Sequence, residues 1–343
     1  MRTCYFDLNI MRRLRFVLFT IIQLVIIGQI SGQQIPMFSQ YIMNGFLINP
    51  SLAGRDGYST TTLTVREQWI GMKGGPSTYA ASFQTSPSKS IFGSMSRDSR
   101  KKVSKPLKSS KVGLGGSIFS DNNGIVHRTG FQADYAYHIP FGKGESDLKF
   151  LSMGLALVTY QFSIKTSDLT YSYNDDPFLN SFDKSVFITD FNFGTSFATS
   201  RYYFGFSMTN LLRGALIYGN SSDNKSGEIG HFFLTGGVNI PVNKEWSLKP
   251  SAFLKTSDLG MKSAQLDLTA RLFYKESYWA GVSYRTSDAI IVMFGLNYDK
   301  FYFTSAFDFT LSDIRTSSAG SFEISIAAKF GDNTRKYKWL NSF

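Results

Sequence analysis

Segments in which apolar and polar side chains alternate recur along most of this chain of 343 residues. Between residues 131 and 139, Phe131, Tyr135 and Ile139 fall on one face, whereas Gln132 and Asp134 fall on the other. A period of two with one apolar face is typical of β-strands. About fourteen such segments, an even number, predict an all-β protein that forms a transmembrane antiparallel β-barrel. These segments start near Tyr58, Ser77, Val112, Ile125, Leu148, Val186, Tyr202, His231, Trp246, Ala264, Tyr278, Ala289, Phe301 and Ser321.

The strands of a soluble β-sandwich would also alternate between apolar and polar residues, so the composition is needed to distinguish a sandwich from a membrane barrel. Charged residues make up 18% of the chain and aromatic residues 16%, with 32 Phe and 18 Tyr. A soluble protein rarely combines so many apolar strand faces with so few charges, whereas membrane barrels carry aromatic girdles at both interfaces. We therefore predict one outer-membrane barrel domain over residues 58–331, followed by a C-terminal periplasmic tail at 332–343.

The first 32 residues resemble a secretory leader. Basic residues follow Met11, an apolar core runs from Phe16 to Ile27, and the small residues Ser31 and Gly32 come next. We expect residues 1–32 to contain a signal peptide that is cleaved near Gly32. Met11 is the expected true start of translation. The alternative is an uncleaved anchor. The single cysteine, Cys4, would be removed with the leader, so the mature chain would have no disulfide and no thiolate metal site.

Residues 33–57 precede the first predicted strand and form an N-terminal periplasmic segment. An apolar run that includes Tyr41 and Phe46 has helix-like spacing, and Ser39 can cap its start. Asn49-Pro50 should stop it, because a residue before proline avoids the helical region. In water this run would expose a large apolar face. We expect it to pack as a plug at the periplasmic end of the lumen, with Asn49-Pro50 turning the chain into the first strand.

The lengths of the predicted connections indicate an orientation. With the N-terminus in the periplasm, the outer loops are long and the inner turns are short, which is the usual arrangement of such barrels. One inner connection, from Pro87 to Ser110, is long instead. Together with Lys111 it carries eight basic residues and one acidic residue, Asp98, which gives a net +7 of the +11 of the whole chain.

This basic connection offers two interpretations. It can bind an acidic partner or anionic lipid head groups, or it can be a passive linker. Nucleic acid is not expected, because the run lacks interleaved aromatic residues and a binding fold. The candidate partner-binding or lipid-binding residues are Arg97, Arg100, Lys101, Lys102, Lys105 and Lys108.

No constellation of residues predicts catalysis. The three histidines, His127, His138 and His231, lie on separate segments, and no metal-ligand spacing or nucleophile motif is present. We expect no catalytic residue, no cofactor, no metal and no small-molecule substrate. Charged residues fall on the polar strand faces, where opposite signs usually pair. They include Asp134, Asp267, Arg271, Arg285, Asp308 and Glu323.

Two stretches near the ends of the chain resemble one known family. The first reads Phe38-Ser39-Gln40-Tyr41, then Asn49-Pro50 and Ala53-Gly54. It continues with Arg66, Gln68 and Trp69 and ends with Gly75-Pro76-Ser77. The second, Phe309 to Asp313 with Gly320 to Glu323, resembles the last hairpin of the same family. They are similar to the PorP/SprF family of type IX secretion system outer-membrane proteins. Family members often have His where this chain has Phe322, and Arg66-Glu67-Gln68 is a local variant of the usual pattern.

The resemblance implies a function but no chemical mechanism. Proteins of this family are non-enzymatic, multi-pass components of the outer membrane of Gram-negative bacteria. They assist export or surface attachment of specific partner proteins, in some cases gliding adhesins. The implied partners are the type IX secretion machinery, a secreted protein cargo and outer-membrane lipid. A competing hypothesis from the barrel pattern alone is a passive or hydrophobic-solute pore, with the N-terminal apolar run as its plug.

Overall fold

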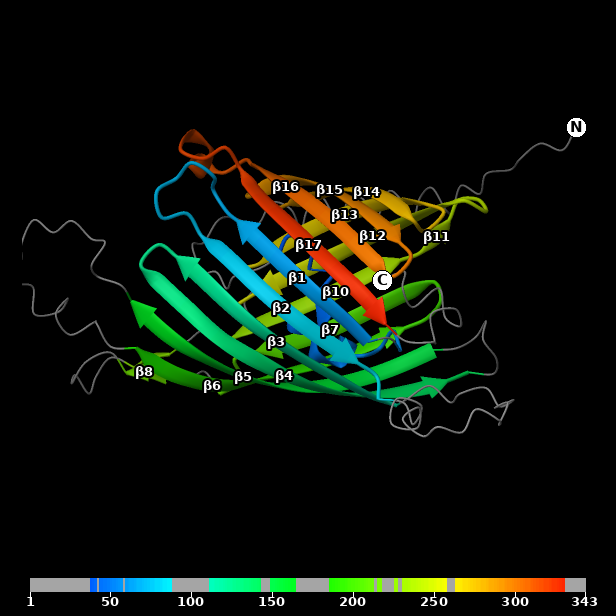
Figure 1. Ribbon diagram of the computed structural model, residues 1–343, viewed down its shortest axis with the longest axis horizontal. Coiled ribbons are helices and arrows are strands. Elements are labelled where there is room, and N and C mark those ends of the chain that lie inside the picture. The colour runs from blue at the N-terminus through cyan, green and yellow to red at the C-terminus, as the bar shows by residue number, and fades with distance from the viewer. Residues whose placement is uncertain are drawn as a thin grey trace, which may run out of the picture.

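The computed structural model describes residues 38–87 except 42 and 58, 111–142, 149–164, 185–212, 215–217, 225–227, 230–257 and 263–330. Within these ranges the chain is an antiparallel barrel of fourteen strands (Figure 1). The barrel strands are β1 (Ser59–Glu67), β2 (Ser77–Thr85), β3 (Val112–Asn123), β4 (Val126–Phe141), β5 (Lys149–Ile164), β6 (Val186–Ala198), β7 (Tyr202–Thr209), β10 (His231–Val238), β12 (Trp246–Thr256), β13 (Gln265–Tyr274), β14 (Tyr278–Arg285), β15 (Ala289–Tyr298), β16 (Phe301–Thr310) and β17 (Ser321–Phe330).

Each of these strands starts within one residue of its predicted position, so the predicted β-barrel is confirmed. Neighbours in the chain are neighbours in the sheet, and two further pairings close the ring. β1 pairs with β17 from Ser59↔Phe330 to Glu67↔Phe322. β10 pairs with β12 from Phe232↔Thr256 to Gly237↔Ser251. Closure removes exposed sheet edges, which is a requirement for a sheet that crosses a lipid bilayer.

The described residues also form shorter elements besides the fourteen barrel strands. β11 (Ile240–Pro241) extends the pairing of β12, and β8 (Ala215–Ile217) pairs with β9 (Lys225–Gly227) in a separate sheet of two strands. The remaining elements are the 3₁₀ turns η1 (Gly45–Leu47), η2 (Pro50–Leu52) and η4 (Asp313–Thr316). Over the residues described, no helix is both long enough and apolar enough to cross a membrane.

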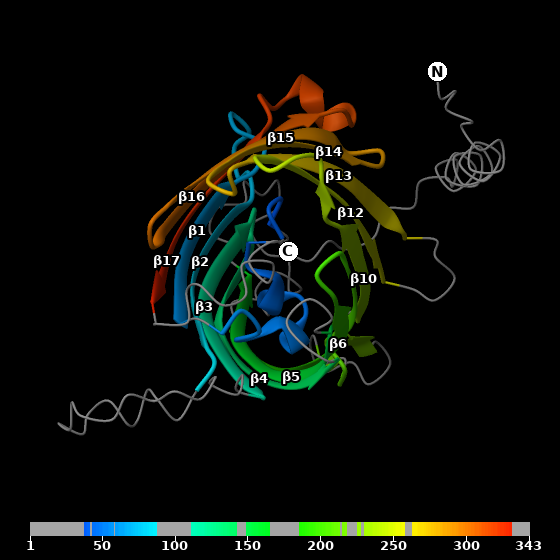
Figure 2. The ribbon, with the colours of Figure 1, turned by 90° about the vertical axis from the view of Figure 1, so that its right-hand side faces the viewer.

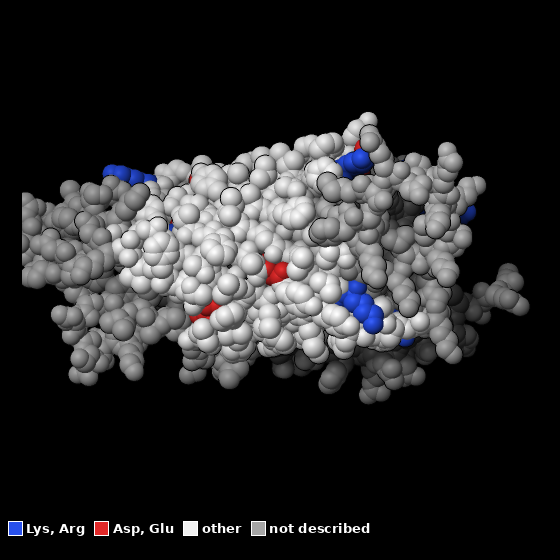
Figure 3. All heavy atoms as spheres, turned by 60° about the horizontal axis from the view of Figure 1, so that its bottom comes forward, with Lys and Arg blue, Asp and Glu red and all other residues white. Residues whose placement is uncertain are grey.

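The alternation of the sequence corresponds to the two faces of the wall. On β4, Phe131, Tyr135 and Tyr137 are exposed outward, whereas Asp134 and His138 are buried inside. The visible outer surface is correspondingly almost free of charged side chains over the middle of the barrel (Figure 3). A belt of aromatic and aliphatic side chains is what lipid contact requires, because an exposed charge at mid-bilayer costs about 2–4 kcal/mol.

The two ends of the barrel differ in their connections. We call the end where β1 begins and β17 finishes the turn end, and the opposite end the loop end. At the loop end, the β1–β2 connection bonds to the β16–β17 connection, since Ile70 N donates to Gly320 O at 2.8 Å and Ala319 N donates to Ile70 O at 2.9 Å. Which end faces the periplasm stays a prediction. The basic residues from Arg97 to Lys108 lie outside the described residues.

The described residues before β1, 38–57 apart from 42, lie inside the barrel (Figure 2). We call residues 38–57 the lumen segment. The predicted position inside the lumen is confirmed, but the predicted helix is wrong: the segment forms only the single turns η1 and η2. Ser39 is not a helix cap, because its hydroxyl donates to Asp308 on β16 instead. Packing against the barrel wall therefore determines the backbone here, rather than the local helix preference of the apolar run.

Candidate functional site: the lumen segment and the barrel wall

The loop end of the lumen segment is bonded to three charged residues of the wall. Glu323 accepts the backbone N–H groups of Ser39 and Gln40, at 2.5 and 3.0 Å. Arg66 lies beside Glu323 at 3.1 Å and beside Asp308 at 3.0 Å, and it also donates to the Ser39 hydroxyl. Only 2% of Arg66 and 1% of Glu323 is exposed. Removal of one partner from such a buried pair typically costs about 3–5 kcal/mol.

A second buried arginine continues this ion network. Arg285 donates from Nε to both oxygens of Asp267 at 3.1 Å, and from Nη2 to Asp267 at 3.0 Å. Its Nη1 lies 3.8 Å from Asp308 and 3.5 Å from Asp288. The expected pairing of opposite charges inside the barrel is therefore confirmed for these residues. Asp308 connects the two arginines, so the lumen segment is held by a network rather than by one pair.

The middle of the lumen segment makes polar contacts through Asn44 and apolar contacts through Tyr41 and Met43. Asn44 donates to Thr64 Oγ1 on β1 at 3.0 Å and accepts from Ser82 Oγ on β2 at 3.2 Å. On the opposite wall, the Tyr41 ring stacks on Phe253 with centroids 4.4 Å apart. Met43 packs against a buried apolar cluster that includes Phe273 and Trp279. Side chains from several strands thus fix this region, so it spans the width of the lumen.

Asn49 binds the wall beyond η1. Its Nδ2 donates to the backbone carbonyls of Thr195 on β6 and Phe206 on β7, at 3.2 and 3.3 Å. Its Oδ1 accepts from Ser51 N at 3.1 Å, which caps η2. Asn49 therefore fixes the turn and attaches it to two strands at once. Asn49-Pro50 does not turn the chain into β1 as predicted, because this pair still lies within the lumen.

Glycines of the wall make this close approach possible. Gly154 on β5 and Gly194 on β6 are directly paired across the strands. A Cβ at Gly194 would lie 2.0 Å from Asn49 Oδ1, and one at Gly154 would lie 2.4 Å from the carbonyl carbon of Pro50. Any larger residue at either position would collide with the lumen segment. These two glycines therefore form a notch that fits Asn49-Pro50.

The lumen segment leaves the barrel at the turn end. His138 Nε2 donates to Ala53 O at 2.9 Å, and Gly54 N donates to Gln84 Oε1 at 2.9 Å. Gly54 has a φ of +62° and its Cα faces the backbone of β2 and β3, a conformation and a space suited to glycine. Because Ser39 is bonded at the loop end and Ala53 at the turn end, the segment traverses the lumen. The predicted confinement to the end where β1 begins is therefore wrong.

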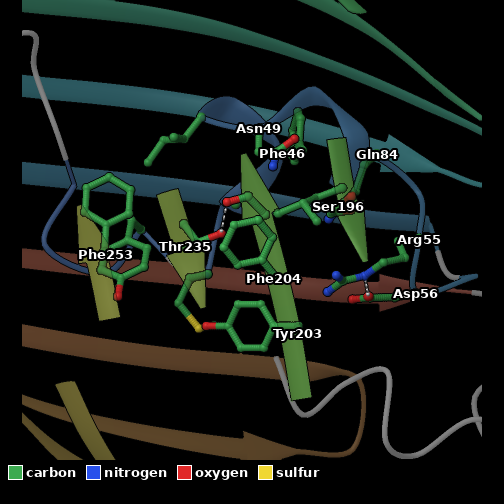
Figure 4. Close-up of a pocket in the computed structure, with 16 residues that line it drawn as sticks. Phe46, Asn49, Arg55, Asp56, Gln84, Ser196, Tyr203, Phe204, Thr235 and Phe253 are labelled. Carbon is green, nitrogen blue, oxygen red and sulfur yellow. Dashed lines mark hydrogen bonds and ion pairs between the residues drawn. The ribbon is translucent and has the colours of Figure 1, made fainter. Parts of the chain in front are cut away.

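Two small cavities lie beside the described part of the lumen segment. One has a volume of about 70 Å³ and lies between Phe46, Asn49 and Arg55 on one side and Tyr203, Thr235 and Phe253 on the other (Figure 4). The second, of about 160 Å³, is bordered by Phe38, Gln132 and Asn192. A water molecule takes about 30 Å³ in the liquid, so these spaces hold a few waters each. They are smaller than the pockets of about 300–1,000 Å³ that usually bind small ligands.

The predicted motif residues fall into two groups. Phe38, Ser39, Gln40, Tyr41, Asn49, Pro50 and Gly54 belong to the lumen segment, and Arg66 is the wall residue that binds Ser39. Gln68, Trp69 and Pro76 lie instead in the loop-end connection, where Gln68 N donates to Pro76 O at 2.7 Å and Trp69 N donates to Ser321 Oγ at 3.2 Å. No cluster of three metal-binding side chains occurs within the described ranges.

Sequence reasoning missed the role of several wall residues. Gly154 and Gly194 contact the lumen segment, yet neither stood out from the strand pattern, and Thr64 and His138 bond to it without having been assigned that role. Asp308 and Glu323 were expected only to pair with other charges. A signal was available: a charged residue on the polar face of β1, β16 and β17 at the same depth predicts one shared network.

Comparisons with known proteins identify the family. The family described as "Type IX secretion system membrane protein PorP/SprF" matches residues 30–328. This chain belongs to the PorP/SprF family. It is therefore a component of the type IX secretion system, and membership implies association with the secretion machinery. The resemblance predicted from the two motif stretches is confirmed.

Other comparisons add little. No curated protein matches this chain. Among solved structures, a Rhodopseudomonas blastica porin triple mutant is similar over 80% of this chain and 99% of its own, at 6% identity and a TM-score of 0.31. BamA from Haemophilus ducreyi lacking POTRA domains 1-3 is similar over 80% of this chain and 70% of its own, at 9% identity and a TM-score of 0.37. Neither likeness is close enough to bear on function.

Proposed function

We propose that this PorP/SprF protein is a non-enzymatic docking component of the outer membrane. In this role it assists export or surface attachment of specific secreted proteins, with gliding adhesins as one class of cargo. The barrel contacts the lipid of the outer membrane of a Gram-negative bacterium, and each of its strands crosses that membrane. Residues 1–32 act as a signal peptide, residues 33–57 include the lumen segment, and residues 332–343 form a tail beyond the barrel.

The observation that carries this proposal is the lumen segment, which traverses the barrel from one end to the other. Family-motif residues hold the lumen segment from Ser39 at the loop end to Gly54 at the turn end. Two cavities beside it measure about 70 and 160 Å³. A lumen built in this way supports a rigid platform more than a path for solutes. The outward belt fixes the platform in the membrane, and the connections at its two ends are free to meet proteins on the two sides.

The two ends then have different partners. We assign the turn end to the periplasm, where it meets the secretion machinery, and the loop end to the outside, where it meets cargo. The length of the loop-end connections supports this orientation. A cysteine introduced at Lys73, in the loop-end connection, should react with a membrane-impermeant maleimide on intact cells. A cysteine at Lys244, in a turn-end connection, should not react until the outer membrane is opened.

The experiment for the docking role combines secretion with solute flux. Cells that lack this protein should lose one or a few secreted proteins from the medium or the cell surface. Purified protein in liposomes should be impermeable to small sugars and antibiotics. Affinity purification in mild detergent should recover both machinery and cargo. If secretion is unchanged without the protein and liposomes leak solutes, the docking proposal fails and the pore hypothesis is correct.

A further inference from the structure

Charge is distributed unequally between the two ends of the barrel. Each described charged residue can be assigned to the end that it is nearer to along its own strand, with Asp134 halfway along β4 left out. At the turn end, ten basic residues face four acidic ones. At the loop end, seven basic residues face eight acidic ones. Over the described residues, the turn end is therefore clearly net positive, whereas the loop end is close to neutral with a slight excess of acid. Figure 3 shows most of the blue side chains of one face towards its right-hand, turn end.

Four of the turn-end cations form an exposed ring around the mouth. They are Lys111 before β3, Arg201 between β6 and β7, Lys244 between β11 and β12, and Lys300 between β15 and β16. None of the four forms an ion pair within the described part of the chain. Because each comes from a different connection, the ring surrounds the mouth rather than marking one side of it.

The wall just inside this mouth adds further positive charge. Lys249 on β12 and Arg271 on β13 are directly opposite each other and face the lumen. Lys249 is paired with Glu276 at 2.7 Å. Arg271 has no carboxylate within ion-pair distance in the described ranges, and its guanidinium lies 5.5 Å from the Phe273 ring and 5.8 Å from the Trp279 ring. One buried guanidinium without an ion pair in the described part of the chain therefore adds positive potential at this end.

Three of the four acids of the turn end pair with cations outside the ring, and the fourth, Asp299, directly precedes Lys300. Glu245 pairs with Lys275 at 3.2 Å, and Asp56 lies 3.9 Å from Lys329 and 4.0 Å from Arg55. A hydrogen bond with Tyr274 and the charge of Glu245 raise the pKa of Lys275, so its ammonium stays charged at neutral pH. At the loop end, by contrast, the buried cations Arg66 and Arg285 form ion pairs with Asp308, Glu323 and Asp267.

We propose that the turn end of the barrel is a docking surface for an acidic protein segment, which covers the mouth and contacts the ring of Lys111, Arg201, Lys244 and Lys300. This inference rests on the proposed docking function and names the chemistry of one partner. A protein fits better than lipid head groups, since the cations encircle and enter the mouth instead of following the outward face. Attraction would extend about 8 Å at physiological salt, so it acts on a partner already close to the mouth.

The test uses the full-length protein in nanodiscs of zwitterionic phosphatidylcholine, with a fluorescent ten-residue polyglutamate peptide as the probe. Fluorescence anisotropy should detect binding that weakens as salt rises. The double variant Lys244→Gln/Lys300→Gln should lower the affinity about fivefold at low salt, because two exposed charge contacts are lost. The matched control, Lys73→Gln/Arg315→Gln, removes two exposed cations at the loop end and should change the affinity less than about twofold.

Three results would overturn the inference. The first is a peptide that does not bind, and the second is an equal loss of affinity in both double variants. The third is loss of binding to phosphatidylglycerol vesicles, but not to peptide, in the turn-end variant, which would assign the ring to lipid. None of these results depends on secretion. Normal secretion in cells that lack the protein would contradict the proposed docking function. If those cells fail to secrete, but the turn-end variant binds the peptide as tightly as the wild type, only the inference about the acidic segment is contradicted.

Discussion

Arg66 and Glu323 are directly opposite each other on β1 and β17, the first and last strands of the barrel, and their side chains are 3.1 Å apart. Both are almost fully buried. Glu323 also accepts two backbone N–H groups of the lumen segment, at Ser39 and Gln40. One ion pair thus stabilises barrel closure and fixes the lumen segment at the loop end. Loss of either charge should affect both.

Arg66→Met should destabilise the barrel by about 3–5 kcal/mol, because Asp308 and Glu323 would stay buried without their main partner. Urea unfolding of detergent-refolded protein would measure this free energy. The matched control is Glu67→Gln, one residue along the same strand. Glu67 accepts from Tyr79 Oη at 2.6 Å at an exposed position, so its loss should cost below about 1 kcal/mol. Equal costs at both positions would contradict a special role of the buried network.

Gly194→Val should displace the lumen segment, since even a Cβ at this position would lie 2.0 Å from Asn49 Oδ1. Overpacking of this kind typically costs about 1–3 kcal/mol. Hydrogen exchange followed by mass spectrometry should show faster exchange of the amides from Gly45 to Gly54. Gly236→Val is the control, because the nearest atom to a Cβ there is 3.7 Å away. Unchanged exchange in the Gly194 variant would mean that the notch is not needed.

Deletion of Phe38–Phe46 should leave a folded barrel with an open lumen. The strands keep their complete pairing, whereas the contacts of Ser39, Tyr41 and Asn44 with the wall are lost. Conductance in planar bilayers should rise, and secretion should fall in cells. Replacement of the same nine residues by a Gly/Ser sequence of equal length controls for chain length. If the deletion changes neither conductance nor secretion, the lumen segment has no sealing or docking role.

An arginine on the outward face should destabilise the folded barrel, and the free-energy cost should increase with the depth of the position in the bilayer. Val282 lies near the middle of β14 and is 52% exposed, so Val282→Arg should cost about 2–4 kcal/mol. Tyr298 ends β15 and is 72% exposed, and Tyr298→Arg at the interface should cost about 0–1 kcal/mol. Folding into lipid vesicles, followed by heat-modifiable gel mobility, would compare them. A reversed order would place the membrane belt elsewhere on the barrel.

The sequence alone determined the strands and their faces. A period of two assigns every side chain of a strand to lipid or to lumen, and this local rule predicted all fourteen strand starts to within one residue. The family could also be predicted, because the motif residues are contiguous in two short stretches. Asp267 and Arg285 were expected to pair as charges of opposite sign, and they do.

Tertiary structure decided the course of the lumen segment. Its apolar run has helix-like spacing, yet bonds to residues distant in the chain replace the intrahelical bonds; Ser39 and Glu323 are 284 positions apart. Such partners become neighbours only when the barrel closes, so no local pattern can reveal them. The notch of Gly154 and Gly194, and the unequal charge of the two ends, likewise follow from register and closure. Sequence periodicity specifies faces, whereas closure specifies which residues share the enclosed space.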